Sequence, residues 1–255
     1  MVKQMVRRGD ILQFSDYPLR HGFSTKRMGN MSFRFDSESM VLENRTRLYE
    51  SLGVRRMIEI APQHGGAVHF VGPESYDLRI PCDALFTSED IFLQLNPADC
   101  FPVYMTGAGG RWCGLVHAGR KSVDCGIIEE SISGVARNFG ERLSDILVAI
   151  GPGIQKCCYG GEELASELRN KPSWAPHITE GPLGFRADLL DYVVSRLREA
   201  GVSLQKISVA SSVWGTPLCT GCAIDSDGTP LFYSHRRSIE TGEPEGRFAA
   251  LVRRQ

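Results

Sequence analysis

The sequence predicts an α+β protein of the layered α/β type, in which a mixed β-sheet is covered by helices. Short apolar runs recur through the middle of the chain, and segments with helical spacing lie between them. The two kinds of segment alternate irregularly, whereas a parallel βαβ fold repeats them strictly. The 255 residues contain no internal repeat, low-complexity tract or visible domain boundary. We therefore expect residues 1–255 to form a single domain.

The predicted strands are apolar at consecutive positions, not at alternate ones. This pattern is typical of strands that are covered on both faces, and it is the reason for expecting helices over the sheet. The strands are expected at Val68–Val71, Ile91–Leu95, Pro102–Met105, Trp112–His117 and Ile146–Ile150.

Three helices are predicted from apolar residues that recur every three or four positions. They cover residues 41–53, 126–140 and 188–201, and each ends at a glycine, the residue that most often stops a helix. The third is expected to begin at Asp188, because a short carboxylate side chain caps the free N–H groups of a first turn.

Composition excludes several classes of function. The net charge is −1, which argues against a general affinity for nucleic acid or for an anionic membrane. No apolar run approaches the roughly 20 residues of a membrane-spanning helix. The first residues, MVKQMVRRGDILQF, are basic but lack the apolar stretch of a signal peptide. We therefore expect a cytoplasmic protein that binds neither nucleic acid nor membrane.

Two histidines and one cysteine are candidates for a metal site. His64, Cys100 and His117 each fall at the edge of a predicted strand or in an adjoining turn, where side chains can converge. Two imidazoles and one thiolate suit zinc, and three protein ligands leave a fourth position for water or substrate. Asp99 precedes Cys100 and is a candidate for orienting a ligand or accepting a proton.

The residues alone leave other interpretations of this set open. The separations are long and match neither HExxH nor a pair of CxxC motifs. The same three residues would be found if the histidines were buried and bonded to backbone groups and the cysteine were an inert buried thiol. A further interpretation is a metal-free hydrolase, in which His117 or His64 activates Cys100 as a nucleophile.

An ordered set of short motifs resembles the YfiH-like laccase-domain family along nearly the whole chain. The motifs are HGFSTK (21–26), NR (44–45), DALFT (83–87), ADCFPV (98–103), VHAG (116–119), AIGPGI (149–154), CCY (157–159), CT (219–220) and LFYSHRR (231–237). In that family the His of an HG motif, the Cys of ADC and the His of HAG bind zinc. The resemblance therefore implies that His64, Cys100 and His117 hold zinc here.

The same resemblance implies a reaction. Members are described as enzymes that phosphorolyse adenosine, inosine or methylthioadenosine, with adenosine deamination as a further activity. The expected substrates are thus a small-molecule nucleoside and phosphate. Zinc suits deamination, because it can activate the water that attacks C6 of adenine. Phosphorolysis needs an anion site, for which the candidates are Ser24, Thr25, Lys26, Lys121, Arg236 and Arg237. The alternative is that these are solvated surface residues.

An older description of the family, copper polyphenol oxidase, fits the sequence poorly. Cysteine and histidine can bind copper, but multicopper oxidation needs about ten histidine ligands. The whole chain has six histidines. Zinc is therefore the expected metal, with copper a weaker candidate.

Several motifs depart from the family pattern on the expected substrate side. The family's HAGWRG reads HAGRKS here, so that Arg120, Lys121 and Ser122 replace Trp, Arg and Gly. The family's TGR reads TGEPEGR at 241–247. These changes indicate a divergent member with altered substrate choice. They also leave open a catalytically silent homologue that acts as a binding module.

A CxxC motif stands apart from the candidate site. Cys219 and Cys222 could form half of a zinc site or a redox pair, but the chain has no second CxxC. Cys219 also falls on the family's CT motif, which favours a packing role. Cys157 and Cys158 lie in a predicted loop, and nothing in the sequence gives them a function.

Overall fold

Thirteen strands form one continuous mixed sheet in the computed structural model, which describes residues 2–75, 78–182, 184–212 and 215–255. The strands of this sheet are β1 Val2–Arg8, β2 Ile11–Phe14, β3 Arg20–Ser24, β4 Met57–Ala61, β5 Val68–Val71, β6 Leu78–Pro81, β7 Ala84–Thr87, β8 Phe92–Leu95, β9 Phe101–Gly107, β10 Cys113–Ala118, β11 Ile146–Ile150, β14 Ile207–Ser211 and β15 Ala250–Arg253. Their order is β5-β7-β10-β9-β11-β14-β1-β2-β3-β15-β8-β4-β6.

The long strand β1 joins the two halves of this sheet. Its first residues, Val2–Gln4, pair in parallel with β14, and its last residues, Met5–Arg8, pair antiparallel with β2. Parallel pairs also join β11 to β14, β5 to β7, and β4 to both β6 and β8, while the other neighbours run antiparallel. The two halves pack face to face, because the inner faces of β9, β10, β8 and β15 share one apolar cluster.

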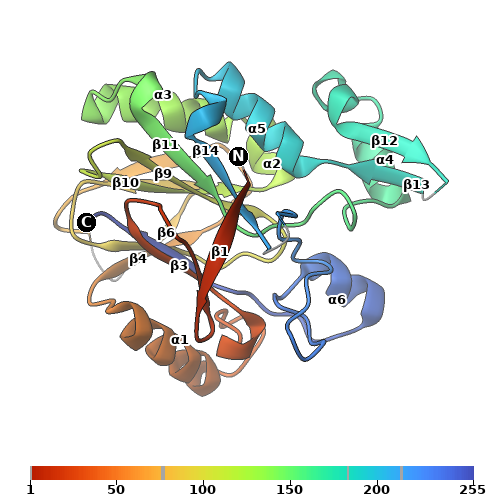
Figure 1. The fold of residues 1–255 in the computed structure, drawn as a ribbon, viewed down its shortest axis with the longest axis horizontal. Coiled ribbons are helices and arrows are strands. Elements are labelled where there is room, and N and C mark those ends of the chain that lie inside the picture. The colour runs from red at the N-terminus through yellow and green to blue at the C-terminus, as the bar shows by residue number, and fades with distance from the viewer. Residues whose placement is uncertain (1, 76–77, 183, 213–214) are drawn as a thin grey trace.

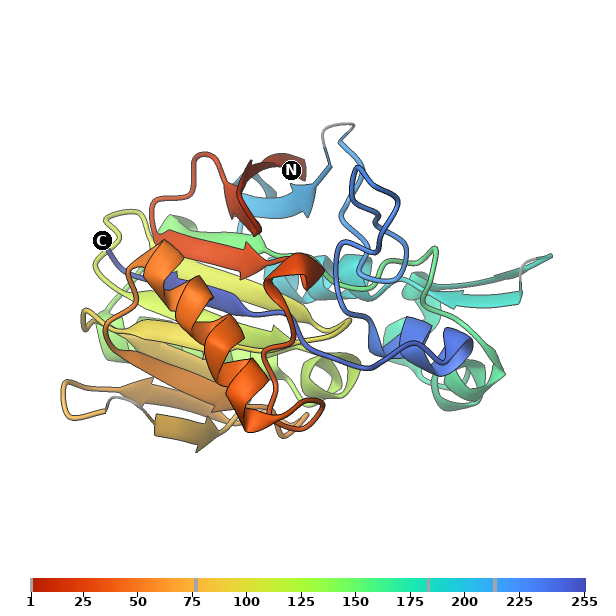
Figure 2. The same cartoon turned by 90° about the horizontal axis from the view of Figure 1, so that it is seen from below.

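Helices cover the outer face of each half (Figures 1 and 2). The described helices are α1 Glu38–Leu52, α2 Arg120–Asp124, α3 Ile127–Phe139, α4 Glu162–Leu168, α5 Leu189–Glu199 and α6 His235–Thr241, with 3₁₀ turns η1 Lys26–Met28, η2 Leu143–Asp145, η3 Pro172–His177 and η4 Leu204–Lys206. Helices α3 and α5 lie over the half that contains β9 and β10, and α1 lies over the other half. A separate hairpin, β12 Ile178–Gly181 and β13 Gly184–Ala187, projects at one side beside α4.

The four layers explain the consecutive apolar residues of the strands. On β9, Val103 and Met105 face the helical layer, while Tyr104 faces the cluster between the two halves. On β15, Leu251 faces α1 and Val252 faces that same inner cluster. Successive side chains of a strand point to opposite faces, so a strand between two apolar layers must be apolar throughout.

The predicted fold class, a layered α+β protein with a mixed sheet, is confirmed. All five predicted strands are present, with bounds that differ by at most two residues. The three predicted helices are α1, α3 and α5. Asp188 caps α5 by accepting the N–H of Asp191, and α1 and α3 end at left-handed Gly53 and Gly140. Among the described residues, no helix is both long and apolar enough to cross a membrane.

A buried ion pair fastens α1 to the sheet. Arg45 of α1 donates one hydrogen bond to Glu59 of β4, at 2.7 Å, and two to the carbonyl oxygen of Met31. The side chains of Arg45 and Glu59 are 8% and 10% exposed. Removing one partner of such a pair leaves a buried charge without compensation.

We therefore expect Glu59→Ala to lower the free energy of unfolding by about 3 kcal/mol, because it leaves the Arg45 guanidinium unpaired in the interior. Urea denaturation followed by circular dichroism measures this change. Glu43→Ala, an exposed substitution on the same helix, is the matched control and should change stability by less than about 0.5 kcal/mol. Equal stability of the two variants would contradict a stabilising role for the pair.

Candidate metal centre

His64, Cys100 and His117 converge at one edge of the sheet, where the side-chain donor atoms all lie within 4.8 Å of one another. The strand directions bring them together. Strand β10 runs antiparallel to both β7 and β9, so its end meets their beginnings, and β5 begins at the same edge because it is parallel to β7. Cys100 directly precedes β9, and His117 lies near the end of β10. His64 stands in the loop before β5.

A buried carboxylate that the sequence did not single out, Asp83, organises this edge. His117 Nδ1 donates to Asp83 Oδ1 at 2.8 Å. The backbone N–H groups of His64 and Gly65 donate to the same carboxylate at 3.0 and 2.8 Å, and the Ser122 hydroxyl donates at 3.1 Å. Because Nδ1 of His117 is engaged, its Nε2 is left as the nitrogen for a metal.

The backbone of His64 is unusual. Its φ angle is +56°, a left-handed conformation that costs a residue with a Cβ roughly 1 kcal/mol or more. The two hydrogen bonds from His64 and Gly65 to Asp83 hold the loop in this conformation. The exposed imidazole of His64 is thereby held edge-on to the ring of His117, with ring centres 4.9 Å apart.

Cys100 and His117 form a charge pair in the absence of metal. Burial alone raises the pKa of the Cys100 thiol, but His117 and His64 outweigh it and lower the pKa to about 6. Burial lowers the pKa of His117, yet the Cys100 thiolate and the Asp83 carboxylate together raise it to about 9. The pKa of Asp83 is lowered, because hydrogen bonds from His117 and Gly65 outweigh its burial. Cys100 is therefore a thiolate at neutral pH, the form that binds metals.

Gly119 makes room for the donor atoms. A Cβ at this position would lie 2.8 Å from Cys100 Sγ and 3.2 Å from Cε1 of His117, closer than side chains tolerate. The register explains this contact, because Phe101 pairs with Ala118 and so brings Cys100 opposite Gly119. The glycine of the VHAG motif is required by this close approach and not by its backbone angles.

The Asp99 carboxylate accepts hydrogen bonds from two segments outside the three donors. Its Oδ1 accepts the hydroxyl of Thr220 at 2.6 Å, and its Oδ2 accepts the backbone N–H of Arg236 at 2.7 Å. The carboxylate that orients His117 is Asp83, not Asp99. Asp99 instead ties the segments around Thr220 and Arg236 to the loop that carries Cys100. Its role as a proton acceptor stays a prediction.

Two arginines and a tyrosine lie beside the three donors. Burial raises the pKa of the Tyr159 phenol to about 12, a rise that Arg120 and Arg236 oppose and that the Cys100 thiolate reinforces. All three groups thus act on one phenol. The Arg236 guanidinium stands over the Tyr159 ring at 5.8 Å, and Arg120 pairs with Glu167 at 2.5 Å. Arg120 and Tyr159 were not among the residues nominated from the sequence.

The other nominated phosphate contacts are spread over different environments. Ser24 and Thr25 are fully buried, and the Ser24 hydroxyl accepts the backbone N–H of Ala249. Lys26 is part-buried and pairs with Glu243 at 3.3 Å. Arg237 binds Glu243 and donates to the carbonyl oxygens of Phe232, Thr220 and Gly221. Lys121 is exposed on α2.

Residues 20–255 match the family model described as multi-copper polyphenol oxidoreductase laccase. The chain belongs to this family. The laccase-domain membership expected from the ordered motifs is thereby confirmed. The sequence has six histidines, and the grouped donors of this site are two histidines and one cysteine.

Proteins similar to this laccase-domain chain are named purine nucleoside phosphorylases. Purine nucleoside phosphorylase YlmD of Geobacillus stearothermophilus is 31% identical over 235 residues, which cover 86% of this chain and 81% of that protein. Human purine nucleoside phosphorylase LACC1 is 26% identical over 238 residues, covering 85% of this chain and 52% of the human protein. The crystal structure of the Geobacillus YlmD has a TM-score of 0.83 at 27% identity and covers 98% of both chains. That of Bacillus licheniformis hypothetical protein YfiH has a TM-score of 0.82 at 25% identity, with 97% of both covered.

In protein stripped of metal, we expect the alkylation rate of Cys100 by iodoacetamide to rise through pH 6 and to level off by pH 8. The thiolate is the reactive form, and the pKa of Cys100 is about 6. In His117→Ala the imidazolium is lost, so the pKa rises and alkylation at pH 7 slows. Peptide mass spectrometry of the labelled protein measures both profiles, with the exposed Cys125 as a reference for the reagent. A wild-type profile that still rises steeply above pH 8 would contradict the charge pair.

Proposed function

We propose that this laccase-domain protein is a zinc-dependent purine nucleoside phosphorylase, with adenosine deamination as a further activity. The observation that carries the proposal is the convergence of His64, Cys100 and His117 at the edge of the sheet, with a carboxylate fixing one of them. The names of the relatives supply the reaction class. We also propose that residues 1–255 act as one domain, because β1 and β15, from the two ends of the chain, lie in the same sheet.

The three donors fit zinc on the chemistry of the set. Zinc is bound by imidazole nitrogen at about 2.0 Å and by thiolate at about 2.3 Å, and catalytic sites combine three protein ligands with an open position. The donor atoms are already grouped within 4.8 Å, and Cys100 carries the charge that a ligand thiolate needs. Asp83 supplies the carboxylate partner that ligand histidines commonly have. Zinc bound there would supply a Lewis acid that polarises the substrate or an oxygen nucleophile.

Arg120 and Arg236 are the groups that we propose for phosphate. In phosphorolysis a phosphate oxygen bonds to the ribose C1′ as the bond from C1′ to the base nitrogen breaks. The base leaves with the electron pair and takes up a proton. Guanidinium groups bind phosphate oxygens in a planar, two-pronged geometry and are always charged. Arg236 lies over the Tyr159 ring, and Arg120 follows Gly119, which packs closely against Cys100 and His117. An anion bound by these arginines would therefore lie near the three donors, and at Arg120 it would compete with Glu167.

A second candidate, a metal-free cysteine hydrolase, has one observation in its favour. The low pKa of Cys100 beside a protonated His117 is the arrangement of an activated thiol nucleophile. The two candidate functions differ in how reactive Cys100 should be when zinc is present. Zinc should protect Cys100 from alkylation in the phosphorylase, whereas the hydrolase needs Cys100 to react rapidly in the protein as purified. The copper oxidase that the family description names would need more histidine ligands than the chain has.

We expect His117→Ala to lose one zinc per chain relative to the wild type and to lower phosphorolysis by about a hundredfold or more, because a Lewis acid contributes several kcal/mol. Metal content is measured by mass spectrometry on protein purified without a metal-affinity tag. Release of free base from adenosine, inosine and methylthioadenosine is followed by chromatography with and without phosphate, and inosine formed without phosphate reports deamination.

His69→Ala is the matched control, because His69 is exposed on β5, five residues from His64, and is not part of the donor set. It should keep both zinc and activity. Full phosphorolysis by a His117→Ala protein that has lost its zinc would overturn the proposal. So would a complete lack of activity on all three nucleosides in the zinc-loaded wild type, which would favour a silent binding module.

We expect Arg236→Ala to raise the KM for phosphate by about tenfold or more while changing the KM for nucleoside much less. A lost hydrogen bond to a charged group costs about 1.5–3 kcal/mol. The backbone bond from residue 236 to Asp99 is kept in this variant. Arg111→Ala is the control for charge alone, because Arg111 lies in the exposed turn between β9 and β10, at the opposite end of these strands. Lys121→Ala tests the nominated lysine in the same assay. Equal phosphate KM values in wild type and Arg236→Ala would contradict the assignment.

A further inference from the structure

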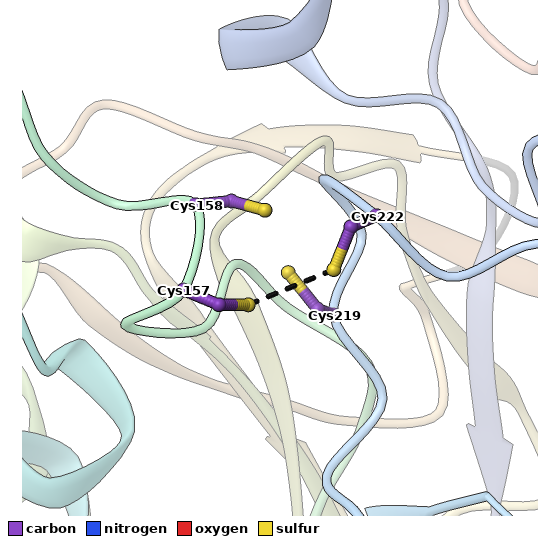
Figure 3. A group of neighbouring side chains, drawn as sticks. All are labelled: Cys157, Cys158, Cys219 and Cys222. Atoms are coloured by element: carbon purple, nitrogen blue, oxygen red, sulfur yellow. Dashed lines mark hydrogen bonds between the residues drawn. The ribbon is translucent and has the colours of Figure 1, made fainter. Parts of the chain in front are cut away.

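Four cysteines form a second cluster, separate in residues from the proposed centre. The side chains of Cys157, Cys158, Cys219 and Cys222 point toward one another from two loops (Figure 3). Their sulfur atoms all lie within 4.8 Å of one another. Cys157 and Cys158 follow β11, and Cys219 and Cys222 lie between β14 and α6. The parallel bridge between Gly153 and Cys219 holds the two loops side by side.

We propose that this cluster is a structural zinc site with four cysteine ligands. In a tetrahedral zinc–thiolate site the Zn–S distance of about 2.3 Å sets neighbouring sulfurs about 3.8 Å apart. Cys157 Sγ and Cys222 Sγ are 3.6 Å apart, close to that value and well beyond the roughly 2.05 Å of a disulfide. A disulfide would also use only two of the four thiols. The other sulfur atoms lie within 4.8 Å of one another, so side-chain rotations would bring them to tetrahedral spacing.

The missing second CxxC is replaced by adjacent cysteines. Zinc ligands usually come in pairs separated by two to four residues, which is why Cys219 and Cys222 alone indicated half a site. The other half is the Cys157–Cys158 pair, whose two sulfurs reach the cluster from a tight turn closed by the Cys158 N–H on the carbonyl oxygen of Gln155. The expected packing role of Cys219 is thereby replaced by a ligand role in our proposal.

The backbone around the cluster donates a hydrogen bond to one sulfur atom and leaves room for another. The N–H of Gln155 points at Cys219 Sγ at 3.3 Å, a contact that stabilises a thiolate. Gly221, inside the CxxC motif, has no Cβ, and one there would lie 2.6 Å from Cys158 Cβ and 3.0 Å from its Sγ. The motif therefore needs glycine so that Cys158 can reach the other three sulfurs.

A metal here would brace the proposed catalytic edge. Cys158 precedes Tyr159, whose ring lies against the Arg236 guanidinium, and Cys219 precedes Thr220, whose hydroxyl binds Asp99, the residue before Cys100. The four thiols would release their protons on binding, and the binding free energy would add to the stability of the two loops. The site is therefore assigned a structural role, and its four protein ligands leave no open position for substrate.

Metal counting tests the site. Protein purified without a metal-affinity tag, loaded with zinc and desalted, is expected to hold two zinc ions per chain. Cys222→Ser should hold one, and Cys125→Ser, which removes an exposed thiol outside the cluster, should still hold two. Cys100→Ala should lose the other ion. If Cys222→Ser lost zinc while Cys100→Ala kept the wild-type zinc content, the result would support this site and contradict the phosphorylase centre. The two proposals therefore fail separately. Zinc content in Cys222→Ser equal to that of the wild type would overturn the site, and so would iron in place of zinc.

Thiol labelling of the wild type gives a test that does not depend on a variant folding. Cys157 and Cys222 are exposed, as is Cys125. With zinc bound, iodoacetamide should label Cys125 but spare Cys157 and Cys222, and a chelator should restore their labelling. Labelling of all three at similar rates in the presence of zinc would overturn the proposal. Protection that a reductant removes and a chelator does not would reveal a disulfide and overturn it as well.

Discussion

The candidate centre depends on the hydrogen bonds that the buried carboxylate of Asp83 accepts. One side chain accepts hydrogen bonds from His117, from the hydroxyl of Ser122 and from two consecutive backbone N–H groups at His64 and Gly65. It thus fixes the ring of one proposed ligand and the strained backbone of another. A buried carboxylate with this many donors is held ionised, and its charge keeps His117 oriented toward Cys100.

The layered sheet makes that interaction possible. Strands β7, β9 and β10 are buried on both faces, so their backbone positions are fixed by packing on two sides. The residues at the ends of these strands are held in place by the same packing, although His64 itself is exposed. A site built from the ends of central strands can therefore hold donor atoms in place before any ligand arrives.

Much of the fold could be predicted from the sequence, because apolar runs and helix caps are local signals. The three candidate metal ligands were nominated by residue type and supported by motif order, since long separations alone do not bring His64 near His117. Asp83 was missed because it meets His117 through strand register: Ala84 pairs with Val116, a non-local fact. Asp99 was nominated because it adjoins Cys100, yet chain adjacency does not decide where a side chain points. The four-cysteine cluster escaped for a related reason, because a CC pair does not have the familiar spacing of zinc ligands.

The structure shows which groups the altered residues of the HAGRKS segment contact, which the sequence alone did not indicate. Ser122, where the family has glycine, donates a buried hydroxyl to Asp83 and so joins the hydrogen bonds that hold His117 and the backbone of His64. Arg120, where the family has tryptophan, exchanges an apolar ring for a guanidinium that acts on Tyr159. The first change adds a donor to Asp83, and the second places a guanidinium, paired with Glu167, near the three donors. On our proposal, the departures therefore leave the three donors in place and change the charge beside them.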